Sequence, residues 1–212
     1  MSSNVYIINT NLAIPGILNW QSRLWKTVKT FTDYRNNVTL EELQAQPTDP
    51  KFAQDDEYMF DSRNYFLKSV TFNIIGSQQL SIAISRLQGL TNRYILQFLL
   101  YIDNSIDFRN INHLLFLILS IRKVSVECMK KSREYERALA VQIIMLAPFA
   151  PHFASELWSA FSMVKHHLID KNEIELDKNV MEQRWPEIDI NYKMAVEVRV
   201  STVFKIFIIL FI

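Results

Sequence analysis

The chain has 212 residues, of which 49% are hydrophobic and 21% are charged, and its formal net charge is +1. This length and apolar content suffice for one domain with a substantial core, whereas only three glycines argue against a sheet-rich fold or a phosphate-binding loop. The single cysteine excludes an internal disulfide and a cysteine-based zinc site, and it fits a reducing compartment.

The sequence shows no metal-binding spacing, targeting segment or membrane span. The histidines do not form a helical metal motif, so we predict no metal. The N-terminus lacks both the apolar block of a signal peptide and the arginines of a mitochondrial presequence. Apolar runs such as residues 114–119 fall far below the roughly 18 residues that span a bilayer. We therefore expect a soluble chain.

Charge is distributed unevenly along the chain. Residues 1–40 hold four Lys or Arg against one acid, residues 41–61 hold one against seven, and residues 62–147 hold eleven against five. Basic helices joined by an acidic connection are compatible with a polyanion partner, and an ordinary solvated surface is the alternative.

The first predicted helix covers residues 14–35. Its apolar stripe, spaced for one helix face and widened by two flanking residues, consists of Ile17, Trp20, Leu24, Val28 and Phe31, with Leu18 and Trp25 beside them. At about 100° per residue, Arg23, Lys26 and Lys29 fall on the opposite arc. These cations could neutralise phosphates or could simply be solvated.

Residues 41–57, with two prolines and a cluster of acids, indicate a linker that begins with a helical turn. A second helix is expected from about Asp56, with its apolar positions at Met59, Phe60, Tyr65, Phe66, Leu67 and Val70. Gly76 and Ser77 mark a break before a third helix over residues 78–100. The stripe of that helix is Leu80, Ile84, Leu87, Thr91, Tyr94 and Phe98. Arg86 and Arg93, seven apart, share another face and are further candidates for phosphate contact.

After a polar break at residues 103–112, an apolar segment at 113–126 is compatible with a helix. Ser132 can cap the next helix, which leads into a corner made by Pro148 and Pro151. Because proline cannot donate a backbone hydrogen bond but suits the first helical position, one helix should end near Ala147 and another begin at Pro151. His152 and Glu156, at i and i+4 after the corner, could hydrogen-bond and hold its geometry.

Beyond the corner helix the pattern becomes a charged loop at residues 165–179 and a turn-like segment at 185–189. Residues 195–201 alternate valine with polar residues, which predicts a strand. The predicted fold is therefore an all-α helical bundle followed by the start of a small C-terminal β-containing unit. No nucleophile and base pair or nucleotide loop can be assembled, and Trp20 and Trp158 are expected in the core rather than as base-stacking platforms.

Four segments resemble, in the same order, the anticodon-binding helical domain of class I leucyl-tRNA synthetases of the bacterial and mitochondrial type. YERALAVQIIMLAPFAPHFASELWSAF at 135–161 is similar to the last helix pair of that domain. GILNWQSRLWKTV at 16–28 is similar to the first helix after the catalytic domain, and SIAISRLQGLTNRY at 81–94 to the third helix. QRWPEID at 183–189 is similar to the Trp-Pro signal before the C-terminal domain.

The resemblance implies a parent enzyme that activates leucine with ATP and Mg and esterifies it to tRNA(Leu), in the mitochondrial matrix or the cytoplasm. Both nucleotide-site signatures of that class are absent from these residues, so the chain alone is predicted to be catalytically inactive, without a cofactor. The family's bundle docks the body of the tRNA and depends little on the anticodon. Arg23 and Lys26 match places where the family commonly carries basic residues.

Three segments, residues 1–12, 100–123 and 204–212, do not match the family. We hypothesise that some of them derive from translated non-coding sequence, and a lineage-specific insertion is the alternative. The predicted organisation is a non-matching segment at 1–12, the bundle at 13–182 with a possible insertion at 100–123, and the start of a C-terminal domain at 183–212. Two other functions remain open: a protein-interaction scaffold, and the equivalent domain of a valyl, isoleucyl or methionyl synthetase.

Overall fold

The computed structural model describes residues 14–102, 124–166 and 173–192, and within these ranges every regular element is helical. In chain order the elements are α1 (Ile14–Asn37), α2 (Leu40–Gln44), α3 (Phe52–Thr71), the π-helical η1 (Phe72–Gly76), α4 (Leu80–Ile102), α6 (Val126–Lys131), α7 (Arg133–Leu146), α8 (Pro151–Ser162) and the 3₁₀ turn η3 (Val180–Glu182). The predicted all-α bundle is confirmed. The strand predicted at residues 195–201 lies outside the described residues.

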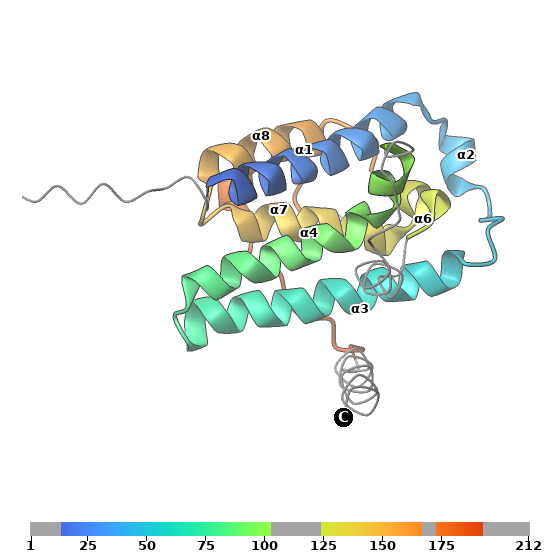
Figure 1. Ribbon diagram of the computed structural model, residues 1–212. Coiled ribbons are helices and arrows are strands. Elements are labelled where there is room, and N and C mark those ends of the chain that lie inside the picture. Colours follow the sequence, from blue (N-terminus) through green and yellow to red (C-terminus); the bar gives the residue numbers. More distant parts are fainter. Residues whose placement is uncertain (1–13, 103–123, 167–172, 193–212) are drawn as a thin grey trace, which may run out of the picture.

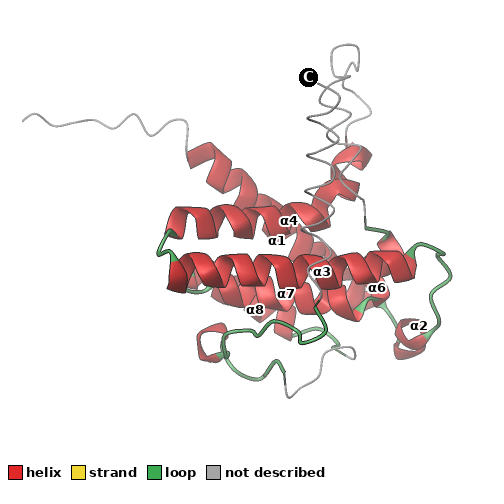
Figure 2. Ribbon diagram, turned by 90° about the horizontal axis from the view of Figure 1, so that it is seen from below, coloured by secondary structure: helices red, strands yellow, loops and turns green. Residues whose placement is uncertain are grey.

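The long helices form a bundle in which α3 and α7 run in one direction and α1, α4 and α8 run in the other. Figure 1 shows α3 and α7 running towards the left-hand end, where η1 leads α3 into α4 and the proline corner leads α7 into α8. Helix α7 lies at the centre and packs against α3, α4 and α8, whereas α1 covers α4 and α8. Figure 2 shows the segment after α8 as a long loop, and its turn η3 packs against α8 and α7. The central α7 is therefore covered by other helices on several sides, whereas α1 and α3 lie on the outside of the bundle.

The burial of α7 explains why its sequence lacks a polar face. All its residues from Ala138 to Leu146 are buried, including the polar Gln142. A helix that is apolar all round belongs in an interior. Gln142 is accommodated because its side-chain amide donates hydrogen bonds to the Leu87 carbonyl at 3.0 Å and to the Thr91 hydroxyl.

The apolar stripe of α1 is confirmed over its central turns and wrong at its edges. Four members of the predicted stripe are buried, namely Trp20, Leu24, Val28 and Phe31. Leu18 and Trp25, by contrast, are 57% and 41% exposed, and Ile17 is exposed as well. The strongest contacts of α1 with other described helices are to α4, α8 and the short α6, and the side chains that flank its stripe are left exposed.

The expected core roles of two tryptophans are confirmed. The indole nitrogen of Trp20 donates a hydrogen bond to the hydroxyl of Thr91 at 2.7 Å, which ties α1 to α4. Trp158 is buried, and its indole nitrogen donates to the Lys178 carbonyl at 2.8 Å. A buried indole stabilises the fold through its area once its N–H has a partner, as both of these have.

The proline corner has the predicted form. Helix α7 ends at Leu146, and Pro151 occupies the first turn of α8. The two backbone amides of Phe149 and Ala150 donate to the Leu146 carbonyl, each at 3.0 Å, so that the end of α7 is closed by the corner itself. Ser132 caps the other end of α7, because its hydroxyl accepts a hydrogen bond from the Tyr135 amide at 2.9 Å. That predicted cap is confirmed.

Helix α3 begins earlier than the sequence pattern indicated. It starts at Phe52 rather than near Asp56, and the predicted helical turn at the start of the linker is α2. Three of the acids interpreted as linker charge, Asp55, Asp56 and Glu57, lie in the first turns of α3, where the helix dipole favours negative charge. Asp55 is buried, and its carboxylate accepts a hydrogen bond from the Ser125 amide at 2.8 Å.

Gly89 allows α3 and α4 to approach closely. A Cβ atom at this position would lie 2.7 Å from Cε1 of Phe66, well inside ordinary contact distance. The predicted break at Gly76 and Ser77 is also present, since η1 ends at Gly76 and α4 starts three residues beyond Ser77.

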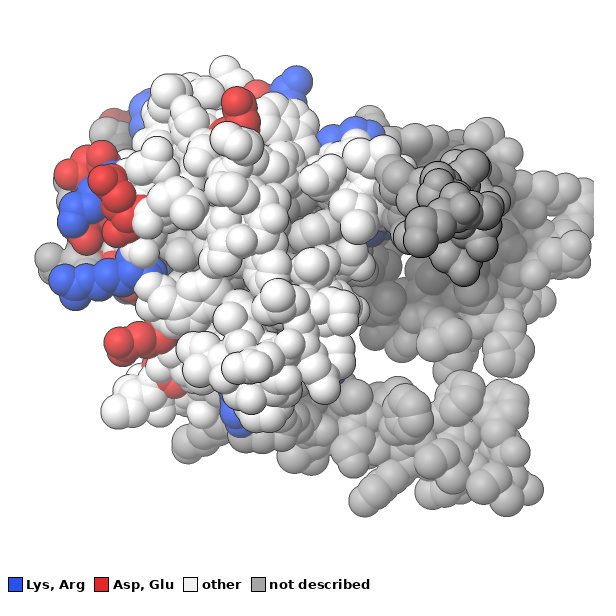
Figure 3. All heavy atoms as spheres, turned by 90° about the vertical axis from the view of Figure 1, so that its left-hand side faces the viewer, with Lys and Arg blue, Asp and Glu red and all other residues white. Residues whose placement is uncertain are grey.

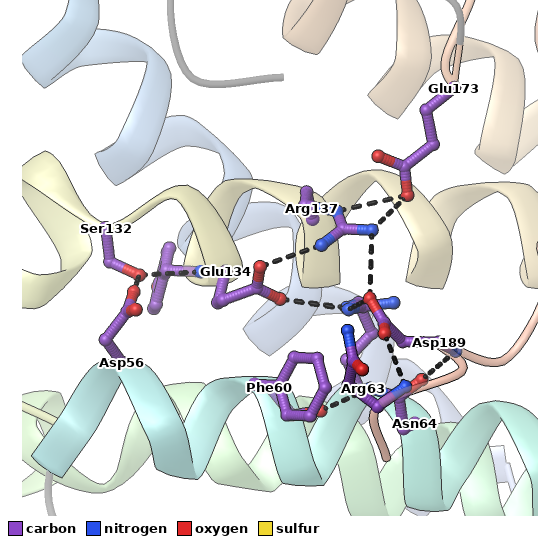
Figure 4. A network of polar contacts seen from close by, with 11 residues as sticks. Asp56, Phe60, Arg63, Asn64, Ser132, Glu134, Arg137, Glu173 and Asp189 are labelled. Atoms are coloured by element: carbon purple, nitrogen blue, oxygen red, sulfur yellow. Dashed lines mark hydrogen bonds and ion pairs between the residues drawn. The ribbon is translucent and has the colours of Figure 1, made fainter. Parts of the chain in front are cut away.

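A polar network joins α3 and α7 to the loop that follows α8 (Figure 4). At its centre the buried guanidinium of Arg63 lies 3.0 Å from the Glu134 carboxylate and 3.9 Å from that of Asp189. Arg137 pairs with Glu134 at 2.8 Å and with Glu173. Burial and the neighbouring Arg137 lower the pKa of Arg63, while Glu134 opposes that shift. The network fixes residues 173–192 along the bundle.

A second buried ion pair joins α1 to α7. The guanidinium of Arg35 lies 2.8 Å from the carboxylate of Glu136, and both side chains are fully buried. The other oxygen of Glu136 contacts Nδ1 of His166, and Arg35 also donates to the Lys165 carbonyl at 3.2 Å. Burial lowers the pKa of Arg35, and the charge of Glu136 opposes this effect. The residues that directly follow α8, Lys165 and His166, are therefore held against α1 and α7 by contacts with this ion pair.

Candidate nucleic-acid interface

Two lysines stand on the outer face of α1, as predicted. Lys26 and Lys29 are exposed, and neither ammonium group forms a hydrogen bond or ion pair with another described residue. Arg23, one turn earlier, is half-buried. Since the opposite face of α1 carries the core stripe, the two lysines project from the bundle, where a polyanion could reach them.

Arg86 and Arg93 differ in how their side chains are used. Arg86 is exposed on α4. The guanidinium of Arg93 instead donates a hydrogen bond to the Tyr58 hydroxyl at 2.8 Å and lies 5.7 Å from the Tyr58 ring and 5.8 Å from the Phe66 ring. It therefore contributes to the packing of α3 on α4. The structure does not bring Arg93 together with the cations of α1.

An open cleft lies beside the end of α1, a position that the sequence pattern did not indicate. Its volume is about 630 Å³, and its lining comes from α1, α2, α6 and the segment after α2. On one wall the ammonium of Lys130 lies 4.5 Å from the centre of the Tyr34 ring, within the range of a cation–π contact. Burial, then the charge of Glu42, raises the pKa of Tyr34. Helix α6, which forms one wall, was not predicted. Two sequence features could have indicated it: Ser125 as its cap, and the basic residues in its last turn.

One acid that lines this cleft, Glu127, accepts hydrogen bonds from backbone amides. The Glu127 carboxylate accepts hydrogen bonds from the amides of Thr48 at 2.9 Å and Asp49 at 2.6 Å, and it pairs with Lys131 at 3.2 Å. Those two amide donors lower the pKa of Glu127 to about 2. Glu127 thereby fastens the segment between α2 and α3 to α6.

The shifted pKa of Glu127 predicts an acid-dependent loss of stability. Because its folded-state pKa of about 2 lies below the ordinary value of 4.5, the stabilisation is complete above pH 4.5 and is lost as the pH falls to about 2. Glu127→Gln should be less stable than the wild type at pH 6 and should approach it at pH 2.5. Urea unfolding across this range measures the difference. Glu57→Gln, a change at an exposed acid of α3, is the control, and parallel pH profiles for Glu127→Gln and the wild type would contradict the prediction.

The residues predicted to shape the corner lie at the surface. Pro148, Pro151, His152 and Glu156 are all exposed, and the side chains of His152 and Glu156 form no hydrogen bond or ion pair with a described residue. The backbone bonds to Leu146 close the corner in this structure. A role for His152 and Glu156 in its geometry stays a prediction.

The described residues present neither a metal site nor a membrane span. Within residues 14–102, 124–166 and 173–192, no group of three His, Cys, Asp or Glu side chains is placed to hold a metal ion. Over the same ranges, no helix is both long enough and apolar enough to cross a membrane. The described part of the chain is a helical bundle with exposed cations on α1 and α4, namely Lys26, Lys29 and Arg86.

This combination is that of a helical domain suited to contact a polyanion. The chain belongs to the family described as the anticodon-binding domain of tRNA ligase, which matches residues 56–210. The match covers most of α3, then α4 and α6 to α8, including the proline corner and the network of Figure 4. tRNA is the partner that this family implies.

Two curated relatives carry the same name, "Probable leucine--tRNA ligase, mitochondrial". The protein of Mus musculus is 27% identical over 180 residues, which are 85% of this chain and 16% of the relative. The protein of Pongo abelii is 26% identical over 186 residues, 88% of this chain and 17% of the relative. The chain thus spans about one sixth of the length of these relatives. No solved structure matches it significantly.

Proposed function

We propose that the chain is the tRNA-binding helical domain of a mitochondrial leucine–tRNA ligase and that its partner is tRNA(Leu). The observation that carries this proposal is the family match over residues 56–210, together with two relatives that are both named as leucine ligases. The exposed lysines of α1 support it, because backbone phosphates are contacted by accessible cations.

In this proposal the chain positions RNA and does not carry out the chemistry. Leucine activation and any binding of ATP with Mg belong to other parts of the ligase, which is about six times as long as the matched region in the relatives. Lys26 and Lys29 are the first candidates for phosphate contact because they are exposed and have no described partner. Arg23 is a weaker candidate because it is half-buried, and Arg86 because it lies on α4, apart from the two lysines of α1. The guanidinium of Arg93 is already hydrogen-bonded to the Tyr58 hydroxyl.

Removing the two α1 lysines should weaken tRNA binding and reduce its salt dependence. Each lost phosphate contact lowers the slope of log affinity against log salt by about 0.7–0.9. We therefore expect the double variant Lys26→Ala and Lys29→Ala to lose about 1.5 from the slope, measured by fluorescence anisotropy with a labelled tRNA(Leu) transcript. Lys51→Ala, at an exposed lysine before α3, should leave the slope unchanged.

Two further comparisons make the experiment decisive. A tRNA(Leu) with an altered anticodon should bind as well as the natural one, because the contacts are to the backbone. If the chain does not bind tRNA at low salt, or binds with a slope that Lys26 and Lys29 do not affect, the proposed interface is wrong. A preference for tRNA of another amino acid would instead contradict the assignment to leucine.

A further inference from the structure

One of the four tryptophans is not used by the fold in the way that the other three are. Trp20, Trp158 and Trp185 each donate the indole N–H to a hydroxyl or carbonyl oxygen of the bundle, at 2.7, 2.8 and 2.9 Å respectively. Trp25 is 41% exposed on α1, and its indole N–H donates to no residue in the described part of the chain. Because a buried indole normally has a partner for this group, the exposed indole of Trp25 is available to another molecule.

Two exposed lysines lie beside Trp25 on the surface of α1. Lys26 is its neighbour in sequence, and Lys29 follows one turn later, at i+4, on the same face of the helix. Neither ammonium group has a partner among the described residues, and Asp33 is the one acid in the whole of α1. Helix α1 lies on the outside of the bundle (Figure 1). We call Trp25, Lys26 and Lys29 the Trp25 patch.

Its cations distinguish the Trp25 patch from other exposed apolar surface of the bundle. Phe72 and Ile75 of η1 are 64% and 72% exposed, but residues 69–85 contain no Lys, Arg, Asp or Glu. Figure 3 shows the end of the bundle where η1 lies as a broad surface without charged residues, with the charges mainly near its edges. The Trp25 patch instead combines an aromatic ring with two cations that have no described partner.

An aromatic ring beside two cations matches the chemistry of an unpaired nucleotide. The flat base can stack on the indole while the lysines contact the adjoining phosphates. In a duplex both faces of a base are covered by its neighbours, so that only an unpaired nucleotide, in a loop or at an end, can stack in this way. A protein partner fits less well, because lysine is depleted from protein interfaces.

We propose that the Trp25 patch binds an unpaired nucleotide of the tRNA, with the base stacked on Trp25 and the phosphates contacted by Lys26 and Lys29. The inference rests on the proposed function and deepens it, since a stacked base adds recognition of RNA shape to the phosphate contacts. Stacking tolerates every base, so the patch recognises an unpaired nucleotide rather than a sequence. It therefore favours tRNA, which has loops, over a continuous duplex.

Fluorescence anisotropy with two labelled RNAs tests the stacking. The full 212-residue chain and its variants are titrated into a tRNA(Leu) transcript and into a blunt, fully paired RNA duplex. We expect Trp25→Leu to weaken binding of tRNA(Leu) about tenfold, and Trp25→Phe, which keeps a ring, to weaken it less than about threefold. Neither variant should change the salt slope, because no phosphate contact is lost, and neither should change the affinity for the duplex. Phe72→Leu, at an exposed ring in a stretch without cations, is the control and should bind tRNA(Leu) like the wild type.

Four other results overturn the inference. If Trp25→Leu binds tRNA(Leu) as tightly as the wild type while Lys26 and Lys29 still determine the salt slope, no base stacks on Trp25 and the proposed function stands. If Trp25→Phe loses as much affinity as Trp25→Leu, or if the duplex loses as much as the tRNA, the ring does not act by stacking on an unpaired base. If Trp25→Leu abolishes a concentration-dependent self-association of the chain and leaves tRNA affinity unchanged, the patch is a protein contact. A wild-type chain that binds neither RNA contradicts the proposed function itself.

Discussion

Replacing Glu136 by alanine should destabilise the chain by about 3–5 kcal/mol, because it leaves the buried Arg35 guanidinium without its carboxylate. Arg35 is fully buried and would retain one hydrogen bond, to the Lys165 carbonyl at 3.2 Å. His166 would lose its contact with the carboxylate at the same time. Urea unfolding followed by circular dichroism gives the free-energy difference from the wild type.

Two variants show whether this loss comes from an unpaired charge. Glu57→Ala removes an exposed carboxylate from α3 and should change stability by less than about 0.5 kcal/mol. Replacing the whole pair, with Arg35→Met and Glu136→Leu, should recover most of the stability, since apolar residues of similar volume often substitute for a buried ion pair. If the double variant is as unstable as Glu136→Ala, loss of packing rather than an unpaired charge explains the effect.

Phe161→Ala should cost about 3–5 kcal/mol through lost burial and the cavity that remains. The Phe161 ring is fully buried where α1, α7 and α8 meet, with its centre 5.6 Å from that of Phe31 and 5.7 Å from that of Trp158. Chemical denaturation again measures the loss. Nearly native stability would mean that neighbouring side chains fill the space.

Trp25→Ala is the matched control for Phe161→Ala, since it also removes an aromatic ring from the bundle. Trp25, on α1, is 41% exposed, whereas the Phe161 ring is fully buried. Its removal should therefore cost much less than that of Phe161. A loss as large as that of Phe161→Ala would mean that Trp25 packs against part of the chain outside the described residues.

Local rules predicted the corner and the helix cap well. A proline without an N–H can end one helix and begin another, so Pro148 and Pro151 determine the boundary from sequence alone. Ser132 followed by an apolar run likewise marks a helix start. By contrast, the start of α3 was missed because Pro47 and Pro50 suggested a longer linker, although the acids that follow suit a first helical turn.

The long-range ion pairs could not be predicted from one sequence. Arg63 and Glu134 are 71 residues apart, and Arg35 and Glu136 are 101 residues apart. Lys and Arg are usually solvated, so periodicity gave no reason to place either arginine inside the bundle. The exposed edges of α1 were misassigned for a related reason: the pattern gives the direction of an apolar face but not how many neighbours cover it.

The same candidate cations show how far sequence can define a site. Helical spacing placed Lys26 and Lys29 on the outer face of α1, and the structure agrees. It also placed Arg93 on a free face of its helix, where the Tyr58 hydroxyl and two aromatic rings in fact hold the guanidinium. The Tyr34 and Lys130 pair was not predicted because its members come from helices distant in the chain.

The network of Figure 4 also sets an order for the synthesis of the chain. Asn64, the neighbour of Arg63, accepts a hydrogen bond from the amide of Asp189, which the ribosome adds 125 residues later. At about 5–20 residues per second, α3 waits roughly 6–25 seconds for its last partner. During that interval Arg63 is shielded only after Glu134 has emerged. The packing of residues 173–192 against α3 is therefore a late event of translation. Until then the surface of α3 that this segment contacts stays uncovered on the nascent chain.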